Sequence, residues 1–159
     1  MKFYICILLI IRSFQSYSQI ADPESLNVFI NKPLTVSYSS IDELCLPKVI
    51  NNAIALKLKV KEYNKSISAQ VNFNNINQAD VPPGWVTLKL ISQDSYNAII
   101  NKYETALSST PTLLFTQPGS TDNEPQFFTF YFDIVLSPQY VFINPSSYNY
   151  SITFTMTEQ

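Results

Sequence analysis

Carboxylates are the side chains of this chain with most scope for acid–base chemistry, because the sequence contains no histidine. Histidine is the commonest general base and nucleophile activator, so its absence excludes Ser-His and Cys-His hydrolases. Paired acids about 5 to 9.5 Å apart would still suffice for glycoside hydrolysis. The candidate acids are Asp42, Glu43, Asp80, Asp94, Asp122, Glu124 and Asp133. They are scattered without a shared motif, so we expect no catalytic site and no enzyme.

Asp133 differs from the other acids because it interrupts an aromatic run, Phe128–Leu136. Alternation along a strand puts it on the face opposite the phenylalanines. We expect a solvent-facing carboxylate there, with an ion pair or a catalytic acid as the alternatives.

The sequence also indicates no metal or cofactor. One cysteine outside the leader described below and no histidine exclude the usual zinc sites. Two glycines cannot build a phosphate-binding loop or a nucleophile elbow. The polar segment 121–124 offers oxygen ligands that calcium accepts, but its spacing is irregular, and a solvated turn is the expected structure.

Aromatic side chains could instead form a surface for stacking on sugars. The candidates are Trp85, Tyr131 and Tyr140. Trp85 follows Pro-Pro-Gly at the entry to a strand, where it either closes the end of the core or stands exposed as a platform. Tyrosines at alternate strand positions are more often half-buried packing residues.

The first 18 residues have the features of a cleaved secretory signal peptide. Lys2 precedes a run of nine apolar residues, 3–11, and Ser16 and Ser18 are the small residues that signal peptidase accepts. The run is about half the roughly 20 residues needed to span a bilayer, so we expect no stable membrane span after cleavage. An uncleaved short anchor is the alternative.

Residues 19–159 are then expected to form a single extracytoplasmic domain, in the periplasm or at the cell surface of a Gram-negative bacterium. This part has eight positive and twelve negative side chains, net −4, which disfavours nucleic-acid binding. Cys6 is lost with the leader, so Cys45 has no partner for an intramolecular disulfide. Between Leu44 and Leu46, Cys45 is expected to be a buried small hydrophobe, with a reactive thiol or an intermolecular disulfide as alternatives.

Period-two alternation of apolar and polar residues dominates the chain and predicts strands. The predicted strands are Leu26–Ile30, Leu34–Tyr38, Ile54–Val60, Ile67–Phe73, Val86–Leu90, Phe128–Leu136 and Tyr148–Met156. The short Glu62–Ser66 turn predicts that the third and fourth of these strands form a hairpin. Tyr96, Ile99, Ile100, Tyr103 and Leu107 recur at helical spacing and predict a short helix near 95–107, although a strand and loop also fit.

Seven or eight short strands with frequent turns predict an all-β fold, an antiparallel two-sheet, immunoglobulin-like β-sandwich. Each amphipathic strand has one apolar face, which a second sheet must cover.

Two features carry a resemblance. The signal ends Ser-Tyr-Ser-Gln, which looks like exported proteins of Bacteroidota-type bacteria. The segments Trp85–Leu90, Phe128–Ile134 and Tyr150–Thr157 resemble small secreted bacterial β-sandwich proteins of the fimbrial-subunit and spore-coat-U-like kind. The chain departs from them in lacking a disulfide and a glycine turn before the last strand, so no functional residue is carried over.

These observations together lead us to expect a non-catalytic exported protein, a cell-surface or fimbria-like structural or adhesion subunit. Terminal strands are natural sheet edges, which can pair with other copies of the chain or with related surface subunits. The candidates for strand exchange are Leu26, Val28, Ile30, Tyr150, Ile152 and Phe154. The alternative is a secreted module that binds glycans or a host surface through Trp85 and the tyrosines.

Overall fold

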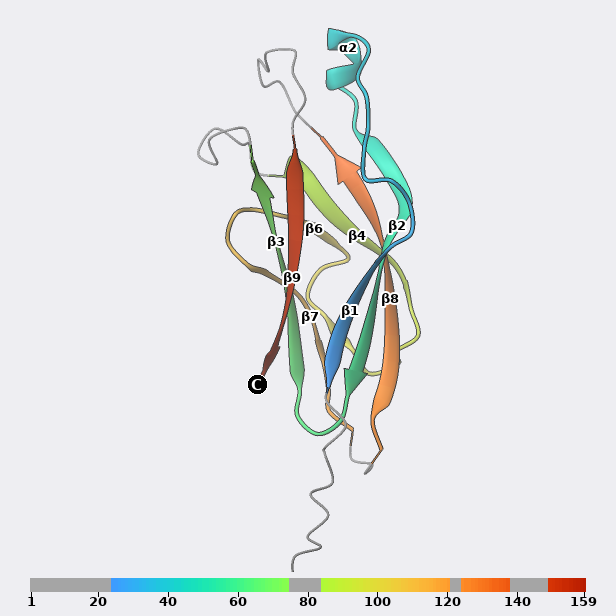
Figure 1. Ribbon diagram of the computed structural model, residues 1–159, viewed down its shortest axis with the longest axis vertical. Helices are drawn as coiled ribbons and strands as arrows, with labels where there is room; N and C mark the ends of the chain where they lie inside the picture. Colours follow the sequence, from blue (N-terminus) through green and yellow to red (C-terminus); the bar gives the residue numbers. More distant parts are fainter. Residues whose placement is uncertain (1–23, 75–83, 121–123, 138–148) are drawn as a thin grey trace, which may run out of the picture.

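Two antiparallel sheets packed face to face make up the body of the protein (Figure 1). The computed structural model describes residues 24–74, 84–120, 124–137 and 149–159. One sheet has five strands in the order β1-β2-β8-β4-β6, and the other has four in the order β5-β7-β3-β9. The predicted all-β, two-sheet sandwich is confirmed, with nine strands in the described ranges.

The five-stranded sheet contains β1 (Ser25–Ile30), β2 (Lys48–Val60), β4 (Val86–Gln93), β6 (Glu104–Ala106) and β8 (Gln126–Leu136). The four-stranded sheet contains β3 (Lys65–Phe73), β5 (Ile99–Ile100), β7 (Thr112–Gln117) and β9 (Tyr150–Glu158). The one helix of the described residues, α2 (Ile41–Leu44), has four residues. No helix in these ranges has the length and apolar character to cross a membrane.

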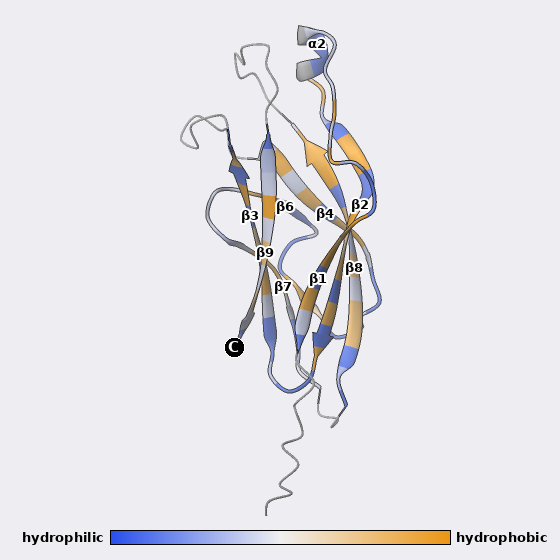
Figure 2. Ribbon diagram, in the orientation of Figure 1, coloured by the Kyte–Doolittle hydropathy of each residue, from blue (hydrophilic) through white to orange (hydrophobic). Residues whose placement is uncertain are grey.

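The core lies between the sheets and is built from alternate strand positions. In β3, Ile67, Ala69 and Val71 are buried, and Figure 2 shows hydrophobic and polar segments following one another along β1 and β9. Phe115 of β7 stacks on Phe130 of β8 with ring centroids 3.9 Å apart, which joins the two sheets. Burial of each such ring contributes about 1.5–3 kcal/mol relative to exposure.

Six of the seven predicted strands are present, with boundaries that differ by a few residues. They are β1, β2, β3, β4, β8 and β9. Segment 34–38 is not a strand, so this prediction is wrong. Its alternation is nevertheless real, because Leu34 and Val36 pack on the core. The segment pairs with no described strand, and an alternating sequence forms a β-strand only where a neighbouring strand is available to pair with it.

The predicted hairpin is also wrong, because β2 and β3 lie in opposite sheets. β2 pairs with β1 and β8, whereas β3 pairs with β7 and β9. Gly119 lies against the crossover between them: a Cβ atom there would come within 1.9 Å of the Glu62 carbonyl oxygen. Alternation shows which face of a strand is buried but not which strand is its neighbour.

The helix predicted near 95–107 is replaced by the short strands β5 and β6. Tyr96 and Tyr103, expected on the buried helix face, are 88% and 66% exposed. Hydrogen bonds among buried polar side chains determine the conformation of this segment instead. The Ser95 hydroxyl donates to Gln117 Oε1 (2.7 Å), and Gln117 Nε2 donates to Asn97 Oδ1 (2.8 Å), which fixes the loop against β7.

Candidate functional site: an open edge of the sandwich

Two long edge strands, β1 and β9, lie side by side on one side of the sandwich (Figure 1). They have six and nine residues, whereas the edges at the far ends of the two sheets, β6 and β5, have three and two. Short strands, charges, prolines and bulges protect an edge from pairing with another chain. β1 has no charged residue, β9 has only Glu158 at its end, and both keep an unbroken register with their neighbours. We call the sides of β1 and β9 that pair with no described strand the open edge.

Alternate residues of β9 direct their backbone groups towards the open edge. In an antiparallel pair, every second residue exchanges both hydrogen bonds with its partner. The Asn74 N–H donates to the Asn149 carbonyl (2.9 Å), and the Gln159 N–H donates to the Asn64 carbonyl (3.0 Å). Odd-numbered residues of this strand are therefore bonded to β3. The even-numbered residues from Tyr150 to Glu158 point their N–H and C=O groups away from it.

The backbone of β1 follows the same rule. The Asn31 N–H donates to the Ala53 carbonyl at 2.9 Å, in register with the pairing of β1 and β2. Odd-numbered residues thus bond β2, and the N–H and C=O groups of Leu26, Val28 and Ile30 point to the open edge.

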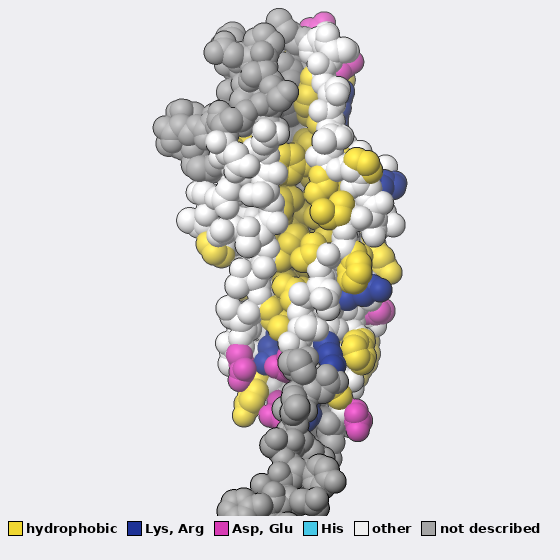
Figure 3. All heavy atoms as spheres, in the orientation of Figure 1, with side chains coloured by type: hydrophobic (Ala, Val, Ile, Leu, Met, Phe, Trp, Pro, Cys, Tyr) yellow, Lys and Arg dark blue, Asp and Glu magenta, His cyan; other side chains and the backbone are white. Residues whose placement is uncertain are grey.

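A band of apolar side chains lies between the two edges (Figure 3). Val28 and Ile30 pair with the core residues Leu56 and Ile54, so they face the interior, yet they remain 45% and 65% exposed. Core-facing side chains stay exposed where the described strands of the opposite sheet do not cover them. The apolar band consists of Leu26, Val28 and Ile30 of β1 with Ile152, Phe154 and Met156 of β9, which pack partly buried on the core.

A three-residue ion cluster closes one end of the open edge. Lys65, 2% exposed at the start of β3, lies 2.5 Å from Glu24 Oε2 and 3.2 Å from Glu158 Oε2. Glu24 directly precedes β1 and Glu158 ends β9, so the lysine fastens both edges. We call these three residues the Lys65 clasp.

The contacts of the clasp favour the charged forms of Lys65 and Glu24. Burial lowers the pKa of Lys65, but the hydrogen bonds to Glu24 and Glu158 outweigh it, and the net shift is upward. Burial likewise raises the pKa of Glu24, and hydrogen bonds from Lys65 and from the Lys61 and Glu62 N–H groups reverse this, so the net shift is downward. An acid held ionised in this way is a poor proton donor at neutral pH.

The other end of the open edge is closed by tyrosine hydroxyls. The Tyr150 hydroxyl of β9 donates to the Leu34 carbonyl at 3.0 Å, which ties β9 to the chain that follows β1. Burial and then the neighbouring Tyr38 raise the pKa of Tyr150 to about 12, so it is a neutral donor throughout the physiological range. The Tyr38 hydroxyl donates to the Leu136 carbonyl at 3.4 Å, and burial raises the pKa of Tyr38 as well.

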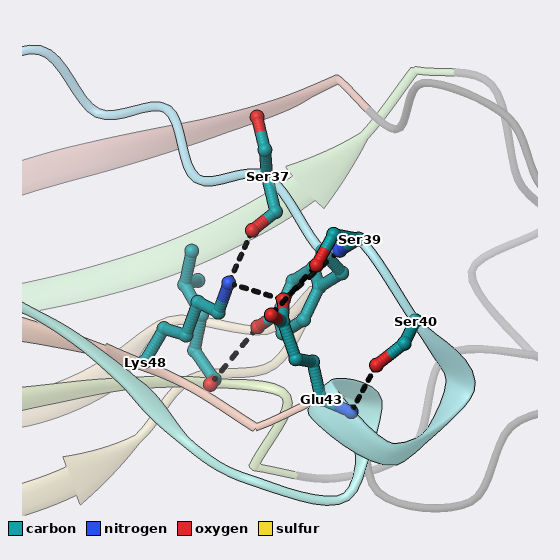
Figure 4. Close-up of polar contacts among 7 residues, drawn as sticks. Ser37, Ser39, Ser40, Glu43 and Lys48 are labelled. Carbon is teal, nitrogen blue, oxygen red and sulfur yellow. Dashed lines mark hydrogen bonds and ion pairs between the residues drawn. The ribbon is translucent and has the colours of Figure 1, made fainter.

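A polar cluster beside this end fixes α2 (Figure 4). Ser40 caps the helix by accepting the Glu43 N–H at 3.2 Å, and the Glu43 carboxylate accepts the Ser39 N–H (2.9 Å) and hydroxyl (2.7 Å). Lys48 lies 3.0 Å from Glu43 and donates to the Ser37 carbonyl. The Ser39 bonds, followed by Lys48, lower the pKa of Glu43 to about 2. These contacts join residues 37–48 to one another, so the role of the cluster is to fix the conformation of this loop.

The sugar-stacking candidates do not form a common surface. Trp85 is 7% exposed and packs on Phe73 with ring centroids 4.9 Å apart, which is the core-closing arrangement. Its ring is not accessible as a platform. Tyr131 is half-buried on β8, the middle strand of the five-stranded sheet, and Tyr140 lies outside the described residues.

Asp133 is not solvent-facing, so that expectation is wrong: the side chain is buried and its Oδ1 accepts the Asn52 N–H at 2.6 Å. Asn52 lies in a bulge of β2, between Ile50 and Ile54, and has a φ of 50°. The carboxylate binds the backbone that the bulge leaves unpaired, which is a structural role.

The remaining chemical candidates are also placed. Cys45 is exposed, which contradicts its expected burial, because it follows α2 in a surface loop. Asp80 and Asp122 lie outside the described residues, as do the other residues of 121–123 that were considered for calcium. Among the described residues no three acidic or cysteine side chains gather as a metal site would require.

The structure places all six residues predicted for strand exchange at the open edge or its end, and their exchange stays a prediction. Sequence reasoning missed the Lys65 clasp, because Lys65 and Glu158 are 93 residues apart and nothing in their local sequence links them.

Comparison of this chain with models of known protein families, with curated proteins and with solved structures finds no match.

Proposed function

We propose that this chain is a non-catalytic, exported structural or adhesion subunit of the cell surface that associates with other subunits through its open edge. The observation that carries the proposal is the asymmetry of the sandwich. Two long, bulge-free edges with a single charged residue, Glu158, at one end lie together on one side, and two very short strands form the edges at the opposite ends of the sheets. Edges without protection pair readily with a further strand.

The half-exposed, core-facing side chains of the apolar band support the same proposal. Val28 and Ile30 would lose water contact when a further strand covers them, at about 25 cal/mol per Å² of apolar surface. Burial of Trp85 removes the main support for the glycan-binding alternative.

A matched pair of substitutions tests the proposal. Ile30 and Ile99 are 65% and 66% exposed, the first at the open edge and the second on β5. Light scattering after size exclusion, over a range of concentrations, should show that residues 19–159 associate. Ile30→Lys should abolish this association and Ile99→Lys should preserve it, with circular dichroism confirming that both fold.

Two results would contradict the proposal. Wild-type protein that stays monomeric up to millimolar concentration would remove association altogether. Equal loss in both variants would show that association does not use the open edge.

A further inference from the structure

We infer that the partner at the open edge is a second copy of this chain, bound by antiparallel pairing of β9 with β9 about a two-fold axis midway between the two copies of Phe154. The inference rests on the proposed association and specifies its partner, its register and its closure.

Phe154 has the backbone geometry that such an axis requires. Its N–H and C=O groups point to the open edge, as the ladder between β3 and β9 dictates. In a symmetric antiparallel pair, the central residue faces its own copy and exchanges both hydrogen bonds with it. Ile152 then bonds Met156 of the second copy, and Tyr150 bonds Glu158 of the second copy. All five outward-facing residues of β9 find partners in this register.

The side chains of β9 are also complementary to themselves in this register. Facing pairs have position numbers that sum to 308, so Ile152 meets Met156, serine and threonine hydroxyls meet threonine hydroxyls, and Tyr150 meets Glu158 at the two ends. On the solvent face, Thr153 faces Thr155 and Ser151 faces Thr157 of the other strand, pairs that favour sheet association. The only charged residue, Glu158, lies at opposite ends of the paired strands, so the two copies do not repel each other.

The edge of β1 is compatible with the same two-fold axis. Glu24 and Glu158 both meet Lys65, and Val28 and Phe154 each lie four residues away from the glutamate of their own segment. At about 3.3 Å per residue the two positions are level. Val28 also has outward backbone groups and lies at the centre of Leu26, Val28 and Ile30. One axis that crosses both sheets, beside Val28 in the first and beside Phe154 in the second, therefore lets both sheets continue into the second copy.

The consequence is a closed dimer. The contact uses the same surface on both copies and occupies the only long edges of the described sandwich. The edges that remain, β5 and β6, have two and three residues. An isologous contact of this kind stops at two subunits and does not propagate a filament.

Charge substitutions on the solvent face of β9 test the register. Thr153→Lys combined with Thr155→Lys places lysine opposite lysine at two symmetric positions of the dimer. Thr153→Lys combined with Thr155→Glu changes the same two residues but places lysine opposite glutamate. These positions form pairs without mutual hydrogen bonds, where facing side chains are closest.

The expected result, measured by analytical ultracentrifugation of residues 19–159, is a dimer whose dissociation constant rises about tenfold or more in the double-lysine variant. The lysine–glutamate variant should stay within about threefold of wild type. Circular dichroism and thermal unfolding of both variants check that the fold survives.

The inference fails if the two variants weaken association equally, or if wild type forms species larger than a dimer. In both cases sensitivity to Ile30→Lys would leave the proposed function standing. A monomeric wild type would overturn both.

Discussion

Lys65 is a charged side chain that the fold keeps almost entirely from water, and its neighbours explain why this is tolerated. Two carboxylates from opposite ends of the described chain meet the ammonium group, at 2.5 and 3.2 Å. Burying a charge without partners would cost several kcal/mol, whereas the attraction of two carboxylates offsets the desolvation cost of this lysine. The residue therefore fixes β1 and β9 relative to each other.

Replacing this lysine should destabilise the protein measurably. Loss of one partner of a fully buried ion pair costs about 3–5 kcal/mol, and because the two glutamates keep some water contact we expect about 2 kcal/mol for Lys65→Met. Urea unfolding followed by the fluorescence of Trp85 measures this. Lys89→Met is the matched control, since the Lys89–Glu104 pair is 47% and 61% exposed and should contribute little. Equal effects in the two variants would contradict a special role for the clasp.

Glu43 gives a prediction about pH. Its folded pKa of about 2 lies below the ordinary 4.5, so its bonds stabilise the loop above pH 4.5 and are lost as the pH falls towards 2. Carboxyl NMR titration should show a midpoint near 2 in wild type. In Ser39→Ala the midpoint should move part of the way towards 4.5, because alanine removes the Ser39 hydroxyl bond but keeps the Ser39 N–H bond. A wild-type midpoint near 4.5 would show that the cluster does not form in solution.

The β2 strand shows how one carboxylate can set the shape of an element. Three residues, 51–53, stand opposite Asp133 alone, so the strand bulges and its backbone N–H at Asn52 needs an acceptor. Asn52 tolerates its positive φ better than most residues would. Beyond the bulge, β2 resumes pairing with β8 in the register that buries Ile54 and Leu56.

Substitution of Asp133 should therefore separate the hydrogen bond from the charge. Asp133→Ala leaves the Asn52 N–H without its acceptor and should cost about 2 kcal/mol, as for a hydrogen bond to a charged group. Asp133→Asn keeps an oxygen acceptor and should cost clearly less. Thermal unfolding measures both, and an alanine variant as stable as wild type would contradict the role given to the carboxylate.

The strands and their buried faces were predictable from the sequence, and their neighbours were not. Alternation identified β8 and β9 because one face of each packs on the core. It could not place β3 in the sheet opposite β2, because pairing depends on loops such as the one held by Gly119. At the open edge, the apolar residues of β1 and β9 were predictable for the same reason. Their exposure, and the clasp between them, depend on contacts between distant segments.

The sheet edges on the two sides of the sandwich differ in how well they are protected from pairing with another chain, and this difference follows from the topology. A five-stranded and a four-stranded sheet bring the first and last described strands together on one side. The opposite ends of the sheets carry only β5 and β6, which are too short to template a long partner strand. Cys45 is the only cysteine in the described residues, so the stability of this part rests on packing and on polar contacts such as the clasp.

The Lys65 clasp also has a consequence for the connectivity of the fold. Because Glu24 and Glu158 meet on one ammonium group, a short glycine linker could join the two ends of the described chain without crossing the sandwich. New ends could then be opened in the exposed 108–111 loop, at Ser109. Such a circular permutant would keep every strand in place, while any passenger protein fused to it would emerge at the 108–111 loop and not beside the clasp.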